Sequence, residues 1–304
     1  MHNVEIPRLK INRNYASEIP ELTPRQFSAF MELVLQFQSG QISATDFKTF
    51  LICKLLNIKK STRWYNLQKE KQDTINENIF RLTETLDSFF DTEKREGKEV
   101  KVLNLNFIKN MLPRIGRYYG PDDALTNCNF YEYKEAHYAC LDYLKTENED
   151  SLNCLVAILY RPRKMFYHIR RFFPGYDGQK RRHYGPKTNP FFLKNRILRI
   201  SRLPFAIRYG TLLWFHSCEE YLMDGKPVID GSEIDLSILY TKGDEGSKGD
   251  IGLTGLIFSL AESGVFGNIE ATADANLYDV MARLVQLKKI KDELEAKQKE
   301  NDQS

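Results

Sequence analysis

The sequence predicts a mainly α-helical protein: a single, helical-bundle-like lobe with a small β-hairpin near residue 230. Three observations predict this fold class. Helix-start residues followed by apolar residues at helical spacing recur along the chain, the segment 204–221 is apolar on nearly all sides, and Asp230-Gly231 favours a type I′ hairpin turn. With 42% apolar and 28% charged residues over 304 positions, the composition is that of a globular protein rather than a disordered chain.

The expected organisation is one helical domain with two flanking segments. Residues 1–22 show little periodicity and are predicted to form an extended N-terminal arm. The helical domain covers residues 23–290 and contains a basic, loop-rich segment, 161–190, and a glycine-rich loop, 243–255. Residues 291–304 are almost all charged or polar, so we expect a charged C-terminal tail that frays.

The first element of the domain is predicted to be a helical hairpin. Thr23-Pro24-Arg25-Gln26 places Thr at the N-cap, Pro at the first helical position and Gln at the third, which is a capping box. Gly40 ends this helix. A second helix is expected to start near Ser43 or Thr45, where apolar residues again recur at helical spacing.

The middle of the chain continues this organisation. Residues 61–90 have a helical apolar face, 91–99 form a charged loop, and 100–107 are compatible with a short strand. Residues 129–146 are predicted to form a helix with an aromatic face. A short apolar helix, 151–160, follows and ends before Arg161-Pro162.

Three more helices are expected towards the C-terminus. Residues 191–201 and 204–221 give two of them, and the third starts near Asn276. The last helix carries an apolar 3-4 repeat that Lys291 interrupts. Its members are Leu277, Val280, Leu284, Leu287 and Leu294.

Glycine occupies every third position from Gly243 to Gly255, five times in succession. A collagen triple helix needs many more triplets and proline in the other positions, neither of which is present. A phosphate-binding loop needs a Lys followed by Ser or Thr, whereas Lys248 is followed by Gly249 and Asp250. We therefore interpret the array as a flexible loop.

The charge of the chain is unevenly distributed. Residues 161–210 contain fourteen Lys or Arg and one acid, Asp177, so this block carries a net charge of +13 within a chain of net charge +3. Cations interleaved with aromatic residues can bind phosphates while stacking bases. The residues that we predict to bind an anionic partner are Arg163, Lys164, Arg170, Arg171, Lys180, Arg181 and Arg182. The alternative is a solvated loop, or a cationic face that docks on the acidic remainder of the same chain.

The sequence carries no catalytic signature, and we expect no enzymatic activity, cofactor or metal. No P-loop, dinucleotide-binding, zinc-protease or nucleophile-elbow motif is present. His137 and Cys140 lie three positions apart, but their spacing to other cysteines does not match close zinc-ligand couples. The five cysteines are interpreted as reduced core residues of a cytosolic protein. Neither a signal peptide nor a membrane-spanning segment is predicted.

Several segments in a fixed order resemble a known group of proteins. They are Leu22 to Phe27 with Gly40 to Ser43, Ala157 to Pro162, Leu203-Pro204 with Leu212 to Phe215 and Cys218, and Gly255 to Gly264 with Asn276 to Val280. Over most of residues 22–290, the order of these segments resembles that in tail-associated proteins of phages and prophages of Bacteroidetes. The layout is similar to that of tail-assembly chaperones. The arginine-rich segment 163–183 and the glycine array have no counterpart in this resemblance.

The resemblance implies a helical, non-enzymatic protein that acts on phage tail assembly by protein–protein binding. Its expected partners are the tape-measure or tail-tube proteins, in the host cytoplasm or in the virion, and self-association is a further option. Apolar stripes on helices can receive amphipathic partner helices. The candidate residues are Tyr133, His137, Tyr138, Leu277, Val280, Leu284 and Leu287. The alternative function is nucleic-acid binding through the basic aromatic block 161–208.

Overall fold

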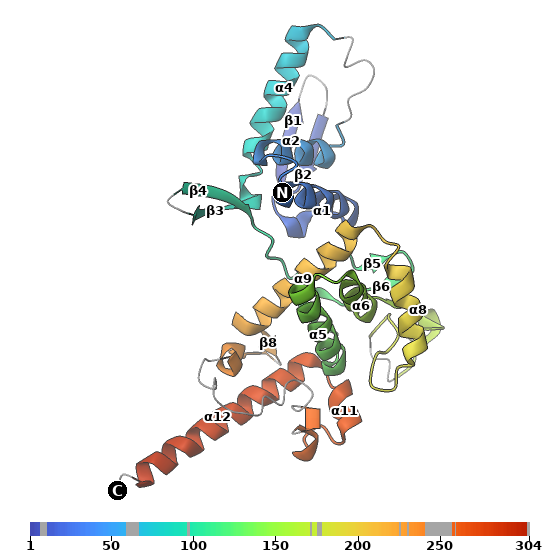
Figure 1. The fold of residues 1–304 in the computed structure, drawn as a ribbon, viewed down its shortest axis with the longest axis vertical. Helices are drawn as coiled ribbons and strands as arrows, with labels where there is room; N and C mark the ends of the chain where they lie inside the picture. The colour runs from blue at the N-terminus through green and yellow to red at the C-terminus, as the bar shows by residue number, and fades with distance from the viewer. Residues whose placement is uncertain are drawn as a thin grey trace. The chain divides into compact units, whose positions relative to one another are not determined.

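A computed structural model gives the structure of the chain (Figure 1). It describes residues 1–6, 11–58, 67–95, 98–170, 172–174, 178–224, 226–229, 231–240, 257–258 and 260–302. The predicted mainly α class is confirmed, and the strands within these ranges form only small antiparallel sheets. The chain divides into two compact units, where the sequence led us to expect one lobe. Unit 1 is Met1–Phe107 with Pro204–Leu213, and unit 2 is Ile108–Leu203 with Trp214–Ser304.

Unit 1 begins with a β-hairpin, in the segment where we expected an extended N-terminal arm. Strands β1 (His2–Ile6) and β2 (Ile11–Tyr15) pair in antiparallel register, and a 3-10 turn, η2 (Ile19–Glu21), follows. Residues 1–22 are therefore largely extended, as expected, but they are not free of the body. Their last apolar side chains, including Tyr15 and Leu22, are buried in the core.

The predicted helical hairpin is confirmed in detail. Helix α1 (Pro24–Gln38) has Thr23 at its N-cap with both halves of the capping box formed, and α2 (Ala44–Leu55) has a second capping box between Ser43 and Asp46. Gly40, between the helices, has a φ of +71°, a backbone conformation that glycine adopts without strain. Local capping groups thus define the ends of both helices.

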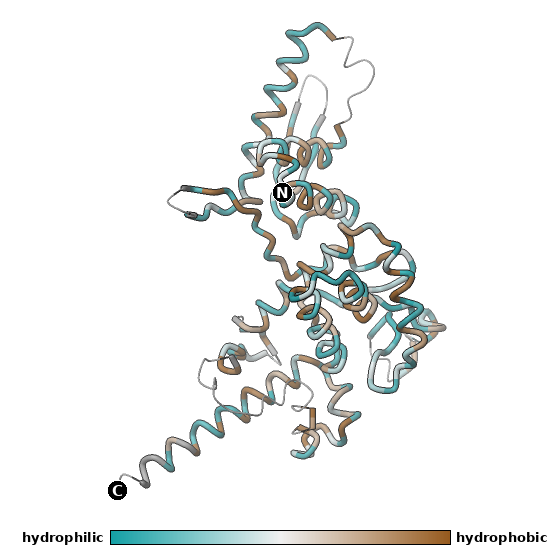
Figure 2. Tube along the Cα trace, in the orientation of Figure 1, coloured by the Kyte–Doolittle hydropathy of each residue, from teal (hydrophilic) through white to brown (hydrophobic). Residues whose placement is uncertain are grey.

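The next segment differs from the sequence-based expectation in one place. Helix α4 (Lys69–Glu84), built mostly of hydrophilic residues (Figure 2), lies within the predicted 61–90. A 3-10 turn, η3 (Asp87–Phe89), leads into strands β3 (Phe90–Arg95) and β4 (Lys98–Leu103), which pair in antiparallel register. The strand near residue 100 is confirmed. The charged loop expected over 91–99 is wrong, because most of it forms the partner strand.

Aromatic side chains form the core of unit 1. Phe30 of α1 contacts Phe47 of α2 edge-on at a ring separation of 5.8 Å, and Phe27 contacts Phe107 at 5.5 Å. The first half of α9 (Phe205–Asp224) completes this core. A Cβ placed on its Gly210 would lie 2.9 Å from Cγ of Met31, so glycine allows the helix to approach α1 closely.

In unit 2, a small three-stranded sheet has the order β5 (Arg114–Ile115), β6 (Tyr118–Tyr119) and β7 (Arg161–Pro162). A 3-10 turn, η4 (Asp123–Leu125), follows β6. Strand β7 contributes a residue pair from the start of the basic block. The sheet therefore attaches that block to the body of the unit.

The helices predicted for the middle of the chain are present. They are α5 (Phe130–Thr146), α6 (Glu149–Leu159) and α8 (Pro190–Ile200), each with an asparagine at the N-cap. Six of the eleven residues of α6 are buried aliphatic side chains, so this helix lies at the centre of the core. The indole of Trp214 on α9 donates a hydrogen bond of 2.9 Å to the carbonyl of Ile108.

The C-terminal part confirms the predicted hairpin and extends the last helix. Strands β8 (Val228–Ile229) and β9 (Ser232–Glu233) pair, with Gly231 between them at a φ of +79°. The turn η5 (Leu236–Tyr240) and the helix α11 (Ile269–Asp274) come before α12 (Leu277–Asp302). Helix α12 is continuous through most of 291–304, where we expected a frayed tail. The glycine array 243–255 lies outside the described residues.

Candidate interaction surfaces

Most of the apolar partner-binding candidates belong to the core. Tyr133, Leu277 and Val280 are buried, Leu284 and Leu287 are half-buried, and Tyr138 alone is well exposed. The prediction of a binding stripe is therefore corrected for the first three residues. The physical reason is that a helix face packed inside the protein and one that receives a partner have the same sequence spacing.

His137 binds a partner within the chain. Its Nδ1 lies 2.6 Å from Oε1 of Glu219 on α9, and Glu219 is buried. The ring of His137 also stacks on Tyr133 at 5.9 Å. This arrangement links α5 to α9, so His137 has a packing role in the structure.

A groove between α1 and α2 has a volume of about 810 Å³. Its apolar lining includes the buried Leu33 and two side chains that are partly open to solvent, Phe50 (45% exposed) and Ile58 (39% exposed). Charged and amide side chains line it as well, among them Arg25, Gln26, Glu32, Gln36 and Lys54. A groove that combines apolar side chains with charges of both signs is suited to an amphipathic helix.

The second surface is a loop that projects from the small sheet of unit 2. We call it the cationic loop, and its described residues are 163–170, 172–174 and 178–182. Its two ends pair with each other: the amide of Lys164 donates to the carbonyl of Lys180 at 2.8 Å, and that of Arg182 donates to Pro162 at 2.9 Å. This short ladder holds both ends of the loop against β7.

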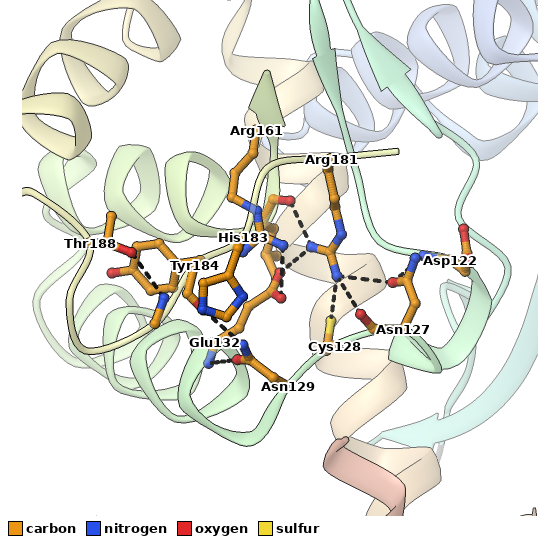
Figure 3. A network of polar contacts seen from close by, with 12 residues as sticks. Asp122, Asn127, Cys128, Asn129, Glu132, Arg161, Arg181, His183, Tyr184 and Thr188 are labelled. Carbon is orange, nitrogen blue, oxygen red and sulfur yellow. Dashed lines mark hydrogen bonds and ion pairs between the residues drawn. The ribbon is translucent and has the colours of Figure 1, made fainter. Parts of the chain in front are cut away.

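Figure 3 shows a buried ion triad of Glu132, Arg161 and Arg181 at the base of the loop. The carboxylate of Glu132, on the first turn of α5, accepts a hydrogen bond of 3.0 Å from Nη2 of Arg161. It also accepts one from Nη1 of Arg181. All three side chains are at most 2% exposed. Glu132, Arg161 and Arg181 come from a helix, a strand and the loop base, so the triad joins three parts of the unit.

Further polar contacts fix Arg181 in place. Its Nη2 donates to the backbone and side-chain oxygens of Asn127, both at 2.9 Å, and its Nη1 donates to the carbonyl of Leu159 at 3.2 Å. Asn129, the N-cap of α5, accepts from the amide of Glu132 and donates to the carbonyl of Tyr184, both at 2.7 Å. The network therefore orients the Glu132 carboxylate as well as the Arg181 guanidinium group.

The electrostatics of the triad leave one cation in excess. Burial lowers the pKa of Arg161 to about 10, against the opposing attraction of Glu132. Arg181 loses hydration in the same way, but its contacts with Glu132 more than offset that loss and raise its pKa. Both guanidinium groups are charged at neutral pH, so the site holds two positive charges and one negative charge.

The predicted anion-binding residues separate into two groups. Arg181 is 1% exposed and holds the loop base, so its prediction as a surface contact is corrected. Arg163, Arg170, Lys180 and Arg182 are exposed, and Lys164 is half-buried. Within the described chain, these four exposed side chains form no ion pair. Arg171 lies outside the described residues.

Large apolar side chains are exposed among these cations. Phe172 is 75% exposed and Phe173 is 63% exposed. Met165, Phe166 and Ile169 are exposed in the same loop. Exposed apolar groups gathered in one short segment mark an interaction surface more often than scattered ones do.

Sequence reasoning missed Glu132 and the groove. Glu132 is one acid among several on the predicted helix 129–146, and nothing in its spacing distinguishes it. Its partners lie 29 and 49 positions away, beyond the reach of any periodicity. The helical hairpin was predicted, and Phe50 belongs to its apolar residues, but only the packing shows which apolar side chains the helices leave open.

Comparison with protein-family models, curated proteins and solved structures found no match to this chain. No helix in the described ranges is long and apolar enough to cross a membrane. The same ranges contain no group of three His, Cys, Asp or Glu side chains that could hold a metal ion.

Proposed function

We propose that the protein acts by binding other proteins, as a non-enzymatic phage tail assembly or structural protein similar to tail-assembly chaperones. The proposed partner is the tape-measure or tail-tube protein. The observation that carries the proposal is the groove between α1 and α2, whose hairpin forms the first segment of the resemblance. A long helical partner exposes an amphipathic face until the tail assembles around it, and a groove lined in part by apolar side chains can cover such a face.

We place the centre of the proposed contact at two exposed apolar side chains of the groove. Phe50 and Ile58 supply the exposed apolar area, and aromatic side chains at the centre of an interface carry much of the binding free energy. The lining also contains the cations Arg25 and Lys54 and the acid Glu32, so it can pair with charges of either sign. The partner is therefore expected to present a helix with an apolar stripe flanked by charged residues.

The test compares Phe50→Lys with a matched control, Phe80→Lys. Phe80 is an exposed phenylalanine of α4 outside the groove. Tagged full-length protein of each form is used to capture partners from the lysate of the native host after nuclease treatment, and quantitative mass spectrometry identifies them. We expect wild type and Phe80→Lys to retain a tape-measure or tail-tube protein. Phe50→Lys should retain at least about tenfold less of it, which corresponds to a loss of about 1.4 kcal/mol of binding free energy.

Two results would contradict the proposal. One is that neither a tape-measure nor a tail-tube protein is retained by the wild type. The other is that Phe50→Lys and Phe80→Lys retain the partner equally, which would place the contact outside the groove.

A further inference from the structure

We propose that the cationic loop is a binding site for single-stranded nucleic acid. The observation that carries the proposal is that four exposed cations, which form no ion pair within the described residues, share with exposed phenyl rings a loop whose two ends are fixed. The cations are Arg163, Arg170, Lys180 and Arg182, and the rings are those of Phe166, Phe172 and Phe173. This site lies in unit 2 and is separate from the groove proposed to bind proteins.

The buried triad gives the loop a fixed foundation. Arg163 and Arg182 flank the two residues, Arg161 and Arg181, that pair with Glu132. The backbone ladder between 162–164 and 180–182 fixes the main chain from which these exposed cations project. The backbone positions of the cations are thus set before any ligand arrives, which reduces the entropy lost on binding.

The charge within this segment favours a polyanion. Asp177 is the only acid between residues 161 and 210. Lys187, also in the basic block, pairs with Glu270 at 2.6 Å, whereas the four exposed loop cations form no ion pair within the described residues. Phosphodiester groups are spaced along a strand so that several can be contacted at once.

The order of side chains favours a single strand over a membrane or a duplex. Cations and apolar side chains are interleaved, with Arg170 between Ile169 and the Phe172-Phe173 pair, so inserting the rings into lipid would draw charges into the acyl region. The helix α7 (Tyr167–Arg170) is one turn long and cannot form an amphipathic surface helix. Exposed phenyl rings stack on unpaired bases, which a duplex does not offer.

The test measures fluorescence anisotropy of labelled 20-nucleotide single-stranded DNA and RNA of mixed sequence with the full chain, over a series of salt concentrations. A duplex of the same sequence and anionic phosphatidylserine vesicles are measured in parallel. We expect binding to both single strands, weaker binding to the duplex, and a logarithm of affinity that falls linearly with the logarithm of the salt concentration.

The loop variant carries Arg163→Gln, Arg170→Gln, Lys180→Gln and Arg182→Gln. It should reduce the magnitude of the salt slope by up to about 3, since each neutralised contact contributes about 0.7 for a single strand. The matched control replaces four exposed lysines elsewhere by Gln, namely Lys69, Lys71, Lys94 and Lys289.

A second variant, Phe172→Ala with Phe173→Ala, should weaken binding about tenfold per stacked ring without changing the salt slope. Phe80→Ala is its control.

Every outcome bears on the proposal. Loss of binding in the loop variants with the controls unchanged supports it, and a preference for DNA or RNA identifies the source of the ligand. Equal loss in the loop and lysine controls would show non-specific attraction and overturn it. Binding to vesicles without binding to either oligonucleotide would overturn it as well.

The wild type and all variants should unfold at the same temperature, because all substituted side chains are exposed. Phe50→Lys, in the groove, should bind the oligonucleotides like the wild type.

Discussion

At the scale of single residues, Glu132 joins three segments of unit 2 through its ion pairs. One carboxylate is shared by two buried guanidinium groups, and each guanidinium comes from a different segment. Removing charges from water is unfavourable, so such a group persists only when its partners are aligned and hydrogen-bonded. Glu132 satisfies both conditions, because Asn129 fixes its backbone and both carboxylate oxygens are occupied.

We predict that Glu132→Gln lowers the free energy of unfolding by about 3–5 kcal/mol, because it leaves two buried cations without a counter-charge. Urea unfolding of the full chain, followed by circular dichroism, measures this. Glu77→Gln on α4 is the control. Glu77 pairs with Arg81 at 2.6 Å and both side chains are more than 60% exposed, so its removal should cost about 1 kcal/mol or less. Equal effects of the two substitutions would show that the triad does not contribute beyond a surface ion pair.

The same network distinguishes neighbouring arginines. Arg181 is buried and Arg182 is exposed, although they are adjacent in the sequence. Arg181→Gln should therefore destabilise the fold by about 3 kcal/mol or more, since Glu132 and Asn127 lose a buried partner. Arg182→Gln should change stability by less than about 0.5 kcal/mol. Thermal unfolding of both variants checks this, and the reverse order of the two effects would contradict the assignment.

At the scale of elements, local capping chemistry explains why helix boundaries could be predicted. The capping box at Thr23 and Gln26 appears in the sequence as it does in the structure, and that of Ser43 and Asp46 follows the same logic. Asparagine at positions 129, 148 and 189 caps three further helices. These signals act within four residues, so they can be recognised without knowledge of the fold.

We predict that Thr23→Ala and Ser43→Ala each lower the free energy of unfolding by about 1 kcal/mol, because each removes an acceptor for an amide at a helix start. Thr45→Ala, in the first turn of α2 but not at its N-cap, is the control and should have a smaller effect. Urea titration of the three variants gives the comparison. An equal change in all three would show that the caps are not what stabilises the hairpin.

Strands were less predictable than helices. The segment 91–99 is charged and contains glycine, so it resembles a loop, yet β3 is held there by β4 across the hairpin. Pairing with a neighbour determines a strand more than intrinsic preference does. The turn at Gly231 was predicted because Asp-Gly is a specific local signal, which shows that hairpins with a strong turn can be found and others cannot.

At the scale of the whole molecule, the basic block is used in two ways. Four of its cations, Arg161, Arg181, Arg196 and Arg208, are buried. Lys187 also pairs with an acid of the chain itself, Glu270. Part of the block therefore packs within the protein, and the proposal of an anionic ligand concerns the exposed cations of the cationic loop.

The buried thiols predict how the fold responds to alkaline pH. Burial raises the pKa of Cys128 and of Cys140 to about 12, compared with 9.0 for an ordinary thiol, and raises the pKa of Cys218 further. The unfolded chain releases these protons at a lower pH than the folded chain. The free energy of unfolding should thus be unaffected by these groups below about pH 8 and fall as the pH rises above about 9.

We expect each thiol to contribute up to about 1.4 kcal/mol per pH unit to this fall. The measurement is the urea midpoint of the full chain between pH 7 and pH 11. Cys140→Ala should make the decline shallower by the share of one thiol, and Cys53→Ala, at a half-buried position, is the control. A stability that does not change up to pH 11 would mean that these thiols are accessible in the folded state.

Local signals in the chain were enough to predict the mainly α class, the helical hairpin at residues 23–55, the hairpin at residue 231 and most helix starts. Capping groups, turn dipeptides and apolar spacing operate over a few residues, so they are visible in a single chain. Packing, in contrast, makes Tyr133, Leu277 and Val280 core residues, buries Arg181 while Arg182 stays exposed, and leaves Phe50 and Ile58 lining an open groove. Burial is set by contacts between residues tens of positions apart, and spacing along the chain carries no record of those contacts.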